Sequence, residues 1–436
     1  MMRKLSSTDS DFATQLDLLL QIPEEDKAAV HKATADIITQ VRAKGDAALV
    51  SYTKQFDDRK VQGMDDLRVA PAQLKQAHDK LPKEVREALT ASFKRVKSYH
   101  EAQLAAHGDL KHWQYEDELG NALGQQIRPL SRLGIYVPGG TAAYPSTIIM
   151  TAVPARVAGV EELTLCVPMP GGAASDALLA AAHLAGIKQV FSIGGAQAIA
   201  AMAYGTESVP QVDKIVGPGN IYVATAKEMV FGQVGIDMIA GPSEVVIIAD
   251  EQANPEWLVQ DLFAQAEHDE QAQAILITPS EKIIAQVLER LPERLAASAR
   301  RAVIEASLAR RGAVIKVADI KEAIALANRI APEHLQLAVA DAESHLTEVQ
   351  HAGAVFLGNE TAEVVGDYTA GPSHVLPTSG TARYASPLGV YDFVSRTSVV
   401  RCSRRGAVEL NRDAAILARE EGLDAHAQAA ESRVAG

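Results

Sequence analysis

The sequence predicts an α/β protein with two domains, each built on a parallel-rich sheet. Short apolar strands recur along the chain, and segments with helical periodicity separate most of them, which is the pattern of crossover units in parallel sheets. The chain has 436 residues, and at roughly 150 residues per domain that length suits two or three domains. Because the strands are too numerous for one sheet, we expect two sheets, together with an N-terminal helical segment and a C-terminal helical arm.

The part of the chain before the first predicted strand is expected to be mainly helical. Residues 1–30 are polar and acid-rich and form an N-terminal segment with one short amphipathic piece, Leu16–Leu20. From about Lys32 to Gln114 apolar residues recur at mostly three- and four-residue steps, as on one face of a helix. We expect residues 31–132 to pack with the later of two groups of predicted strands, the group between residues 245 and 357.

The predicted strands fall into two groups. They are residues 133–137, 163–167, 190–193 and 214–216, and then residues 245–248, 274–277, 314–317, 335–339 and 355–357. A break near Ala240–Ser243 separates the groups, so residues 133–243 form one predicted domain, and residues 31–132 and 244–385 form the other. Beyond about Ser386 the alternation stops, and the final charged helix lacks the apolar surface for its own core. We therefore expect residues 386–436 to be an arm that docks on a partner subunit.

The net charge and the cysteine content exclude several classes of function. Lys and Arg number 42 and Asp and Glu 55, a net charge of −13, which argues against a nucleic-acid binder because phosphate contact needs a basic field. The two cysteines, Cys166 and Cys402, form no CxxC pair, so a disulfide framework and a thiolate zinc cage are excluded. The sequence shows no apolar signal core and no apolar run of the roughly 18 residues that a membrane span needs. We expect a cytoplasmic protein that binds neither nucleic acid nor membrane.

A helix predicted to begin at Asn254–Pro255 carries the first candidate site. Gln265 and His268 are three residues apart, so they lie on one helix face beside an apolar stripe. They are either hydrogen-bonded core residues, which the spacing alone favours, or two metal ligands. Without a thiolate, such a metal site has only nitrogen and oxygen ligands, which suits Zn²⁺ and admits Mn²⁺ or Co²⁺.

Two further segments carry groups with acid-base or ligand chemistry. Glu333 and His334 stand between a helical pattern and a strand, either as an exposed turn or as an acid and a base that serve sequential proton transfers. They precede their strand, whereas open α/β sheets usually place sites at the carboxyl ends of strands. Asp367 lies in the glycine-punctuated loop Gly366–His374, where the carboxyl end of a strand does place ligands. It is either a turn residue or the carboxylate that Gln265 and His268 lack.

Three glycine loops follow strands of the first group: Pro138–Gly140, Gly194–Gln197 and Gly217–Asn220. None is a GxGxxG fingerprint, so they indicate ordinary α/β turns as readily as a nucleotide crevice. Within the sequence there is also no GxxxxGK[ST] loop, no GxSxG elbow and no HExxH motif.

Taken together, these motifs resemble those of the histidinol dehydrogenase family, from about Ala33 to the C-terminus. The most specific segments are Gly134–Gly140, Gly194–Ala200, Asp213–Asn220, Ala240–Glu244, Gln265–His268, Pro332–Leu335 and His374–Thr378. The resemblance implies two incomplete Rossmann-like domains, of which residues 133–243 bind NAD, and residues 244–385 carry the metal and catalytic residues. It also implies oxidation of L-histidinol through L-histidinal to L-histidine, the last steps of histidine biosynthesis, with two NAD⁺ and one Zn²⁺ per subunit.

The resemblance also implies a role for each matching residue. The zinc ligands would be Gln265, His268, Asp367 and His426, the last from the other subunit of a homodimer with shared active sites. Glu333 and His334 match the catalytic pair, with His334 as the base and Glu333 activating water. Tyr136, Gln197 and Asn220 match NAD-contacting positions. The substrate L-histidinol would be bound by Ser243, Gln265, His268, His334, Asp367, Glu421 and His426.

Other functions stay open at this point. The chain could oxidise another small alcohol, although Glu421 and His426 favour an amine- and imidazole-bearing substrate. It could be a zinc hydrolase with Glu333 as base, or a solute-binding module, for which a Glu-His pair has no use. One departure from the family pattern is Ser373, where many members carry Asn before the histidine.

Overall fold

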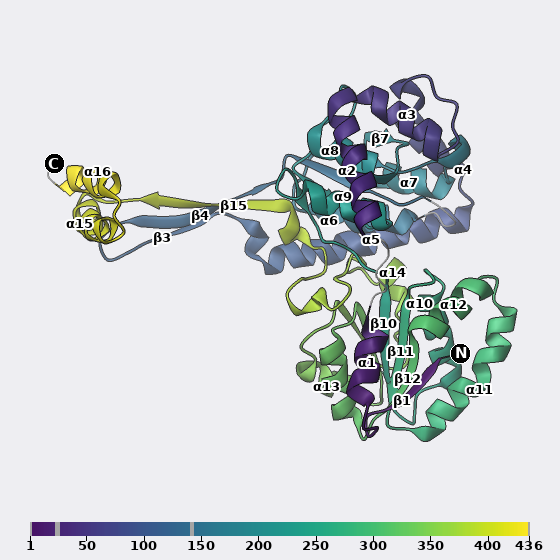
Figure 1. Ribbon diagram of the computed structural model, residues 1–436. Coiled ribbons are helices and arrows are strands. Elements are labelled where there is room, and N and C mark those ends of the chain that lie inside the picture. Colours follow the sequence, from purple (N-terminus) through teal and green to yellow (C-terminus); the bar gives the residue numbers. More distant parts are fainter. Residues whose placement is uncertain (1, 22–26, 140–143, 435–436) are drawn as a thin grey trace.

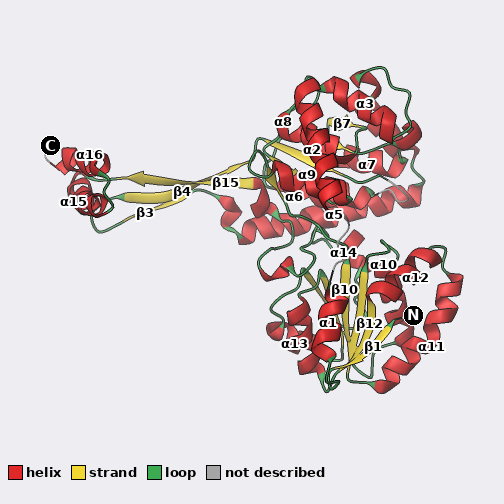
Figure 2. Cartoon of the chain, viewed as in Figure 1, coloured by secondary structure: helices red, strands yellow, loops and turns green. Residues whose placement is uncertain are grey.

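The structure is a computed structural model that describes residues 2–21, 27–139 and 144–434. It consists of two α/β domains, one above the other in Figure 1, and an arm that projects away from both. Each domain has a central sheet with helices on both faces (Figure 2). The predicted fold class is therefore confirmed, with parallel strands dominating both large sheets.

The first domain contains a six-stranded sheet in the order β2-β7-β6-β5-β8-β9. Its strands are β2 (Arg68–Val69), β5 (Arg132–Tyr136), β6 (Glu162–Cys166), β7 (Gln189–Phe191), β8 (Lys214–Val216) and β9 (Gly235–Ile236). Its helices are α2 (Lys27–Lys44), α3 (Asp46–Phe56), α4 (Pro71–Lys80), α5 (Lys83–Ala106), α6 (Pro145–Val157), α7 (Asp176–Leu184), α8 (Gly195–Tyr204) and α9 (Ile221–Val230). Strands β5 to β9 are parallel, and β2 joins the edge antiparallel to β7. In chain order, β5 to β9 have the spatial order 3-2-1-4-5 of Rossmann folds.

The second domain contains a parallel six-stranded sheet in the order β1-β12-β11-β10-β13-β14. Its strands are β1 (Arg3–Ser6), β10 (Glu244–Ala249), β11 (Gln273–Thr278), β12 (Gly312–Lys316), β13 (His334–Ala338) and β14 (Ala354–Leu357). Its helices are α1 (Phe12–Leu20), α10 (Pro255–Ala266), α11 (Glu281–Ala297), α12 (Arg301–Arg311), α13 (Ile320–Ile330) and α14 (Val364–Tyr368). Strands β10 to β14 repeat the 3-2-1-4-5 order, and β1 is added at the edge.

The apolar strands are continuous because helices cover both faces of each sheet. In β10, Val245 and Ile247 pack against α10 and α11, while Val246 and Ile248 face the core with α1 and α13. Among the described residues, no helix combines the length and apolar character that a membrane span requires.

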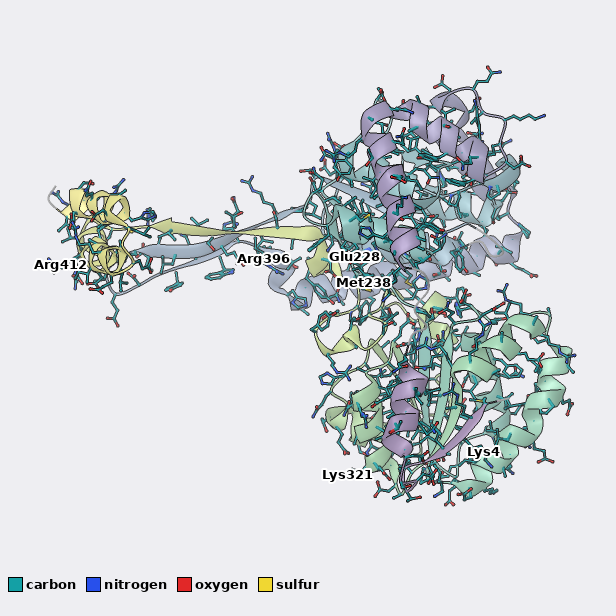
Figure 3. The ribbon with its side chains drawn as sticks, viewed as in Figure 1. Lys4, Glu228, Met238, Lys321, Arg396 and Arg412 are labelled. Atoms are coloured by element: carbon teal, nitrogen blue, oxygen red, sulfur yellow. The ribbon has the colours of Figure 1, made fainter. Side chains whose placement is uncertain are left out.

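The arm is a separate unit of strands and helices. It consists of the antiparallel strands β3 (Trp113–Glu116), β4 (Ala122–Pro129) and β15 (Val394–Arg401), followed by α15 (Arg404–Glu420) and α16 (Asp424–Val434). Arg396 on β15 and Arg412 on α15 lie on this arm, well away from the two domains (Figure 3). A single charged C-terminal helix was predicted, where the structure has α15 and α16. This sheet was not predicted, because its three strands alternate little and come from distant parts of the chain.

The domain division differs from the expected one. Residues 31–132 were assigned to the domain of the second strand group, but α2 packs on α8 and α9, and β2 pairs with β7, so the helical part belongs to the first domain. Residues 113–129 belong to the arm instead. The expected N-terminal segment is also no separate unit, since β1 pairs with β12 and Leu16 and Leu19 of α1 enter the second core. Amphipathic periodicity indicates that a helix has an apolar face but not which sheet that face covers.

Candidate active site between the two domains

The candidate site lies at the amino edge of the sheet of the second domain. His334 begins β13 and pairs in register with Val245 of β10, so Glu333 and His334 adjoin Glu244 at the same edge. Asp367, on the short helix α14, lies with its Oδ1 4.0 Å from Nε2 of His334. The carboxyl-end position expected for the Asp367 loop was therefore wrong, because the chain after β14 returns to the amino edge and places α14 at the junction of the domains (Figure 1).

His334 is held in one orientation by the backbone of β10. Its side chain is buried, and its Nδ1 lies 3.1 Å from the carbonyl oxygen of Glu244. A carbonyl can only accept, so Nδ1 carries the hydrogen and donates it. Burial lowers the pKa of His334 to about 4, although the charge of Asp367 opposes that shift. The ring is therefore neutral near pH 7, with an unprotonated Nε2 that points toward the acids of the site.

Glu333 is buried too, which excludes the exposed-turn alternative for the pair. One carboxylate oxygen accepts a hydrogen bond from the backbone N–H of Glu244 at 2.9 Å. Burial raises the pKa of Glu333 well above its usual value, and the charges of Glu244, Asp367 and Glu363 raise it further. An acid held in this way takes up a proton far more readily than an ordinary carboxylate.

Asp367 is the centre of the polar cluster. Its carboxylate lies 3.9 Å from Nε2 of His268 and 3.8 Å from Nδ1 of His374, besides its approach to His334. The Nδ1 of His374 also lies 3.1 Å from the carbonyl oxygen of Asp367. Asp367 is therefore a partner of three histidines rather than a turn residue.

Glu363 is a member of the cluster that the sequence analysis did not identify. Its Oε1 lies 3.5 Å from Nε2 of His334 and has no hydrogen-bond partner among the described residues. His334, Glu363 and Asp367 together form a group whose ligand atoms lie within 4.8 Å of one another, close enough to hold one metal ion. The available signal was weak: Glu363 and Asp367 are four residues apart, so they lie on one face of a single helical turn.

Gln265 also fits a metal site. It lies on the last turn of α10, whose N-cap Asn254 and first-turn Pro255 confirm the predicted start. The Gln265 side chain is fully buried, and neither its amide oxygen nor its amide nitrogen has a hydrogen-bond partner among the described residues. The hydrogen-bonded core alternative is therefore wrong. An orphaned amide oxygen, imidazoles and carboxylates form a nitrogen and oxygen donor set suited to Zn²⁺.

The first domain forms the other wall of the site. Thr147 on α6 lies 3.3 Å from Nε2 of His374, and Ser373 donates a hydrogen bond to the carbonyl of Met150 at 3.0 Å. Ser373 thus ties the loop of the second domain to α6. Because α6 follows β5, these contacts bring the carboxyl edge of the first sheet toward the cluster. That edge is where open α/β sheets bind ligands.

The expected NAD-contacting residues lie at that carboxyl edge. The Tyr136 hydroxyl accepts a hydrogen bond from the backbone N–H of Gly195 at 3.1 Å, which joins the loops after β5 and β7. Gly217, with φ +114°, packs so closely that a Cβ there would collide with the backbone oxygen of Tyr136. Asn220 caps α9 by accepting hydrogen bonds from the backbone of Tyr222 and Val223. Gln197 lies in the buried first turn of α8, while Gly140 falls outside the described residues.

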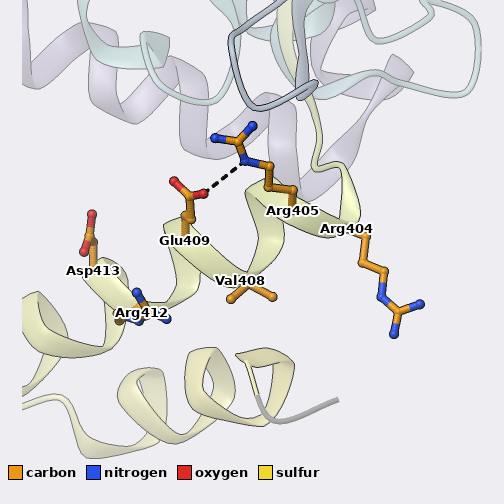
Figure 4. Close-up of a pocket in the computed structure, with 6 residues that line it drawn as sticks. All are labelled: Arg404, Arg405, Val408, Glu409, Arg412 and Asp413. Carbon is orange, nitrogen blue, oxygen red and sulfur yellow. Dashed lines mark hydrogen bonds and ion pairs between the residues drawn. The ribbon is translucent and has the colours of Figure 1, made fainter.

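The three remaining expected site residues lie in two places. Ser243 directly precedes Glu244 at the amino edge, and its carbonyl accepts a hydrogen bond from the N–H of Gln273 at 2.9 Å. Glu421 and His426 are exposed. They lie at the end of α15 and on α16, two helices of the arm that projects away from both domains (Figure 1). An open hollow on α15 is lined by Arg404, Arg405, Val408, Glu409, Arg412 and Asp413 (Figure 4), none of which belongs to the candidate site.

Comparisons with known proteins agree with the geometry. The sequence profile described as histidinol dehydrogenase matches residues 20–434. Histidinol dehydrogenases of Chromobacterium violaceum and Pseudomonas aeruginosa are 57% and 53% identical, over 99% of this chain in each case and 99% and 97% of theirs. The crystal structure of histidinol dehydrogenase from Elizabethkingia anophelis superimposes with a TM-score of 0.91 at 34% identity, covering 99% of this chain and 98% of that one.

Proposed function

Since the chain belongs to the histidinol dehydrogenase family and is therefore an NAD-dependent oxidoreductase acting on histidinol, we propose how its residues carry out the reaction. The overall change is a four-electron oxidation of L-histidinol through L-histidinal to L-histidine, with two NAD⁺ used in succession. The observation that carries the proposal is the neutral, oriented imidazole of His334 beside the carboxylate of Asp367, which also approaches His268.

Gln265, His268 and Asp367 are the proposed Zn²⁺ ligands from this chain, with one ion per subunit. The orphaned amide of Gln265 and the approach of His268 to Asp367 support this assignment. Zinc held by these residues would supply a Lewis acid for the nitrogen groups of the substrate. Ser243, at the same edge as Glu244, is proposed to contact the substrate.

In the first oxidation His334 serves as the base. As the carbinol carbon transfers a hydride to the nicotinamide of NAD⁺, Nε2 of His334 takes the hydroxyl proton, and the carbon-oxygen bond becomes a carbonyl. The fixed hydrogen on Nδ1 leaves the lone pair of Nε2 facing the site, as this role requires.

In the second oxidation Glu333 is proposed to activate water. Glu333 takes a proton from water as the oxygen attacks the aldehyde carbon, which gives the hydrate as its monoanion. Loss of a second hydride to NAD⁺ and of a proton then yields the carboxylate. The raised pKa of Glu333 suits this proton uptake, since a carboxylate with a raised pKa is a stronger base than an ordinary one.

The remaining residues are proposed to come from a second copy of the chain. Glu421 and His426 are exposed on an arm that projects away from both domains (Figure 1), so a homodimer in which each arm reaches the partner's cluster would complete both sites. His426 would be the fourth zinc ligand and Glu421 a substrate contact. Enclosure by the arm would also keep the aldehyde from water outside the site.

The test is to mix purified, zinc-loaded protein with a limiting amount of L-histidinol and excess NAD⁺ and to follow NADH by its absorbance. We expect two NADH for each L-histidinol, with L-histidine as the product. Formation of one NADH with release of aldehyde would refute the role of Glu333 in a second oxidation. Absence of NADH would refute the dehydrogenase assignment.

A further inference from the structure

The structure contains a buried carboxylate that the proposed reaction does not use. Asp57 follows the last residue of α3 and is 8% exposed. Its Oδ2 is covered and has no hydrogen-bond partner among the described residues. A buried polar atom without a partner costs on the order of 1–3 kcal/mol, so the position of this oxygen calls for a ligand.

Asp57 lies over the carboxyl ends of β6 and β7. Its carbonyl accepts a hydrogen bond at 3.2 Å from the N–H of Gly171, in the turn that follows β6. Two residues further on, Arg59 donates a hydrogen bond at 2.6 Å to the hydroxyl of Ser192, which follows β7. The segment from Asp57 to Arg59 therefore crosses the edge at which this sheet would bind a dinucleotide.

The charge of Asp57 also acts on Tyr136, at the end of β5. Burial raises the pKa of Tyr136 to about 12, and the charges of Cys166 and Asp57 act in the same direction. The carboxylate is thus within electrostatic reach of a residue that we place in the NAD crevice.

The strand order indicates which part of a bound dinucleotide would lie beside Asp57. Strands β5 and β6 are the first and second strands of the 3-2-1-4-5 order, and in Rossmann folds an acid after the second strand accepts hydrogen bonds from the adenosine ribose. Here β6 is followed by Val167, Pro168, Met169 and Pro170, which include no acid. Asp57 reaches the same place from a different part of the chain.

We propose that Asp57 accepts hydrogen bonds from the adenosine ribose hydroxyls of NAD and thereby selects NAD over NADP. The inference rests on the proposed NAD crevice. The side chains that cover Oδ2 would turn aside as the ribose enters, and the carboxylate would repel a 2′-phosphate. The guanidinium of Arg59 keeps its charge, which acts on Asp57 and partly offsets this repulsion, while hydrogen bonds to the Ser192 hydroxyl and to the Asp66 carbonyl at 3.0 Å hold it in place.

The experiment compares Asp57→Asn with Asp58→Asn, a matched change at an exposed neighbour. In the zinc-loaded enzyme we expect Asp57→Asn to raise KM for NAD about tenfold or more, the scale of one charge-assisted hydrogen bond. Turnover at saturating NAD and KM for L-histidinol should stay near those of Asp58→Asn. The ratio of kcat/KM for NADP to that for NAD should rise.

Binding of fragments identifies the half of the cofactor concerned. By calorimetry, ADP-ribose should bind Asp57→Asn more weakly than Asp58→Asn, whereas nicotinamide mononucleotide should bind both equally. Equal KM values for NAD in the two variants would overturn the inference about Asp57. The proposed function would still stand in that case if the wild-type enzyme oxidises L-histidinol with NAD. If Asp57→Asn alters KM for L-histidinol, kcat and the melting temperature together, Asp57 has a structural role. That result would also overturn the inference.

Discussion

Nδ1 of His334 lies 3.1 Å from the carbonyl oxygen of Glu244, the first residue of the neighbouring strand. This hydrogen bond fixes the tautomer of the imidazole, and its acceptor is a backbone carbonyl of β10 rather than a side chain. The same residue, Glu244, donates its N–H to Glu333 at 2.9 Å. One strand end therefore orients both proposed proton acceptors, which explains how adjacent residues in the sequence can serve one cavity.

The first prediction separates the proposed base from the metal ligands. We expect His334→Asn to lower kcat by 10²-fold or more, on the order of a lost general base, while zinc content stays near one per subunit. The Asn amide can still donate to the Glu244 carbonyl, so the fold should persist. His268→Asn should instead empty the metal site. Elemental analysis of both variants checks the division, and equal loss of zinc in the two would contradict it.

The second prediction concerns the orphaned amide of Gln265. Gln265→Met should weaken zinc binding, because it removes the amide oxygen. In the metal-free protein the same change should leave the melting temperature unchanged or raise it, since an unpaired buried amide costs about 1–3 kcal/mol. Gln260→Met, at an exposed position of the same helix, is the control. A fall in the melting temperature of the metal-free Gln265→Met protein alone would mean that the amide has partners in the fold.

The third prediction tests whether sites are shared between subunits. His334→Asn and His426→Asn should each be nearly inactive alone. After the two variants are unfolded together and refolded at equal amounts, random pairing in a homodimer gives half heterodimers, and each has one intact site. Activity should therefore return to about 25% of that of refolded wild type. Failure to recover activity, with dimers present by light scattering, would place His426 in the site of its own chain or outside any site.

Strands β5 to β8 and β10 to β14 could be predicted because doubly covered strands are continuous apolar runs, whereas the short edge strands β1, β2 and β9 were not predicted. The preference of Asn for the N-cap and of Pro for the first turn of a helix also predicted the start of α10 at Asn254–Pro255. Glu363 could not be predicted, because nothing near it in the sequence indicates that α14 returns to the amino edge beside His334. The partners of the helices before β5 were misassigned for a similar reason, since periodicity carries no information on tertiary contacts.

The fourth prediction concerns a buried ion pair behind the Gly217–Asn220 loop. Lys227 on α9 pairs with Asp237 and donates to the carbonyl of Gly217 at 3.0 Å, while Asp237 accepts from the N–H of Gly217 at 2.8 Å. Lys227→Met should raise KM for NAD by shifting this loop. It should also destabilise the protein by about 3–5 kcal/mol, because Asp237 is left charged and buried.

The double variant Lys227→Met/Asp237→Asn separates those two effects. It removes the uncompensated charge, so its melting temperature should recover most of the loss. KM for NAD should stay raised, since the Gly217 carbonyl still lacks its ammonium donor. If KM for NAD recovers together with the melting temperature, the pair contributes to stability alone.

The fifth prediction concerns the dependence of stability on pH. His100 is buried on α5, and its Nδ1 lies 2.8 Å from the carbonyl oxygen of Val96. Burial lowers its pKa below the usual 6.5, although the bond to Val96 opposes the shift. Below about pH 6.5 the unfolded chain therefore binds a proton that the folded chain does not, and stability falls as the pH falls. His100→Gln removes this linkage, so its melting temperature should drop less than that of wild type between about pH 7.5 and about pH 5.5. His31→Gln, at an exposed position of α2, should follow wild type, and equal slopes for all three proteins would show that His100 becomes protonated without unfolding.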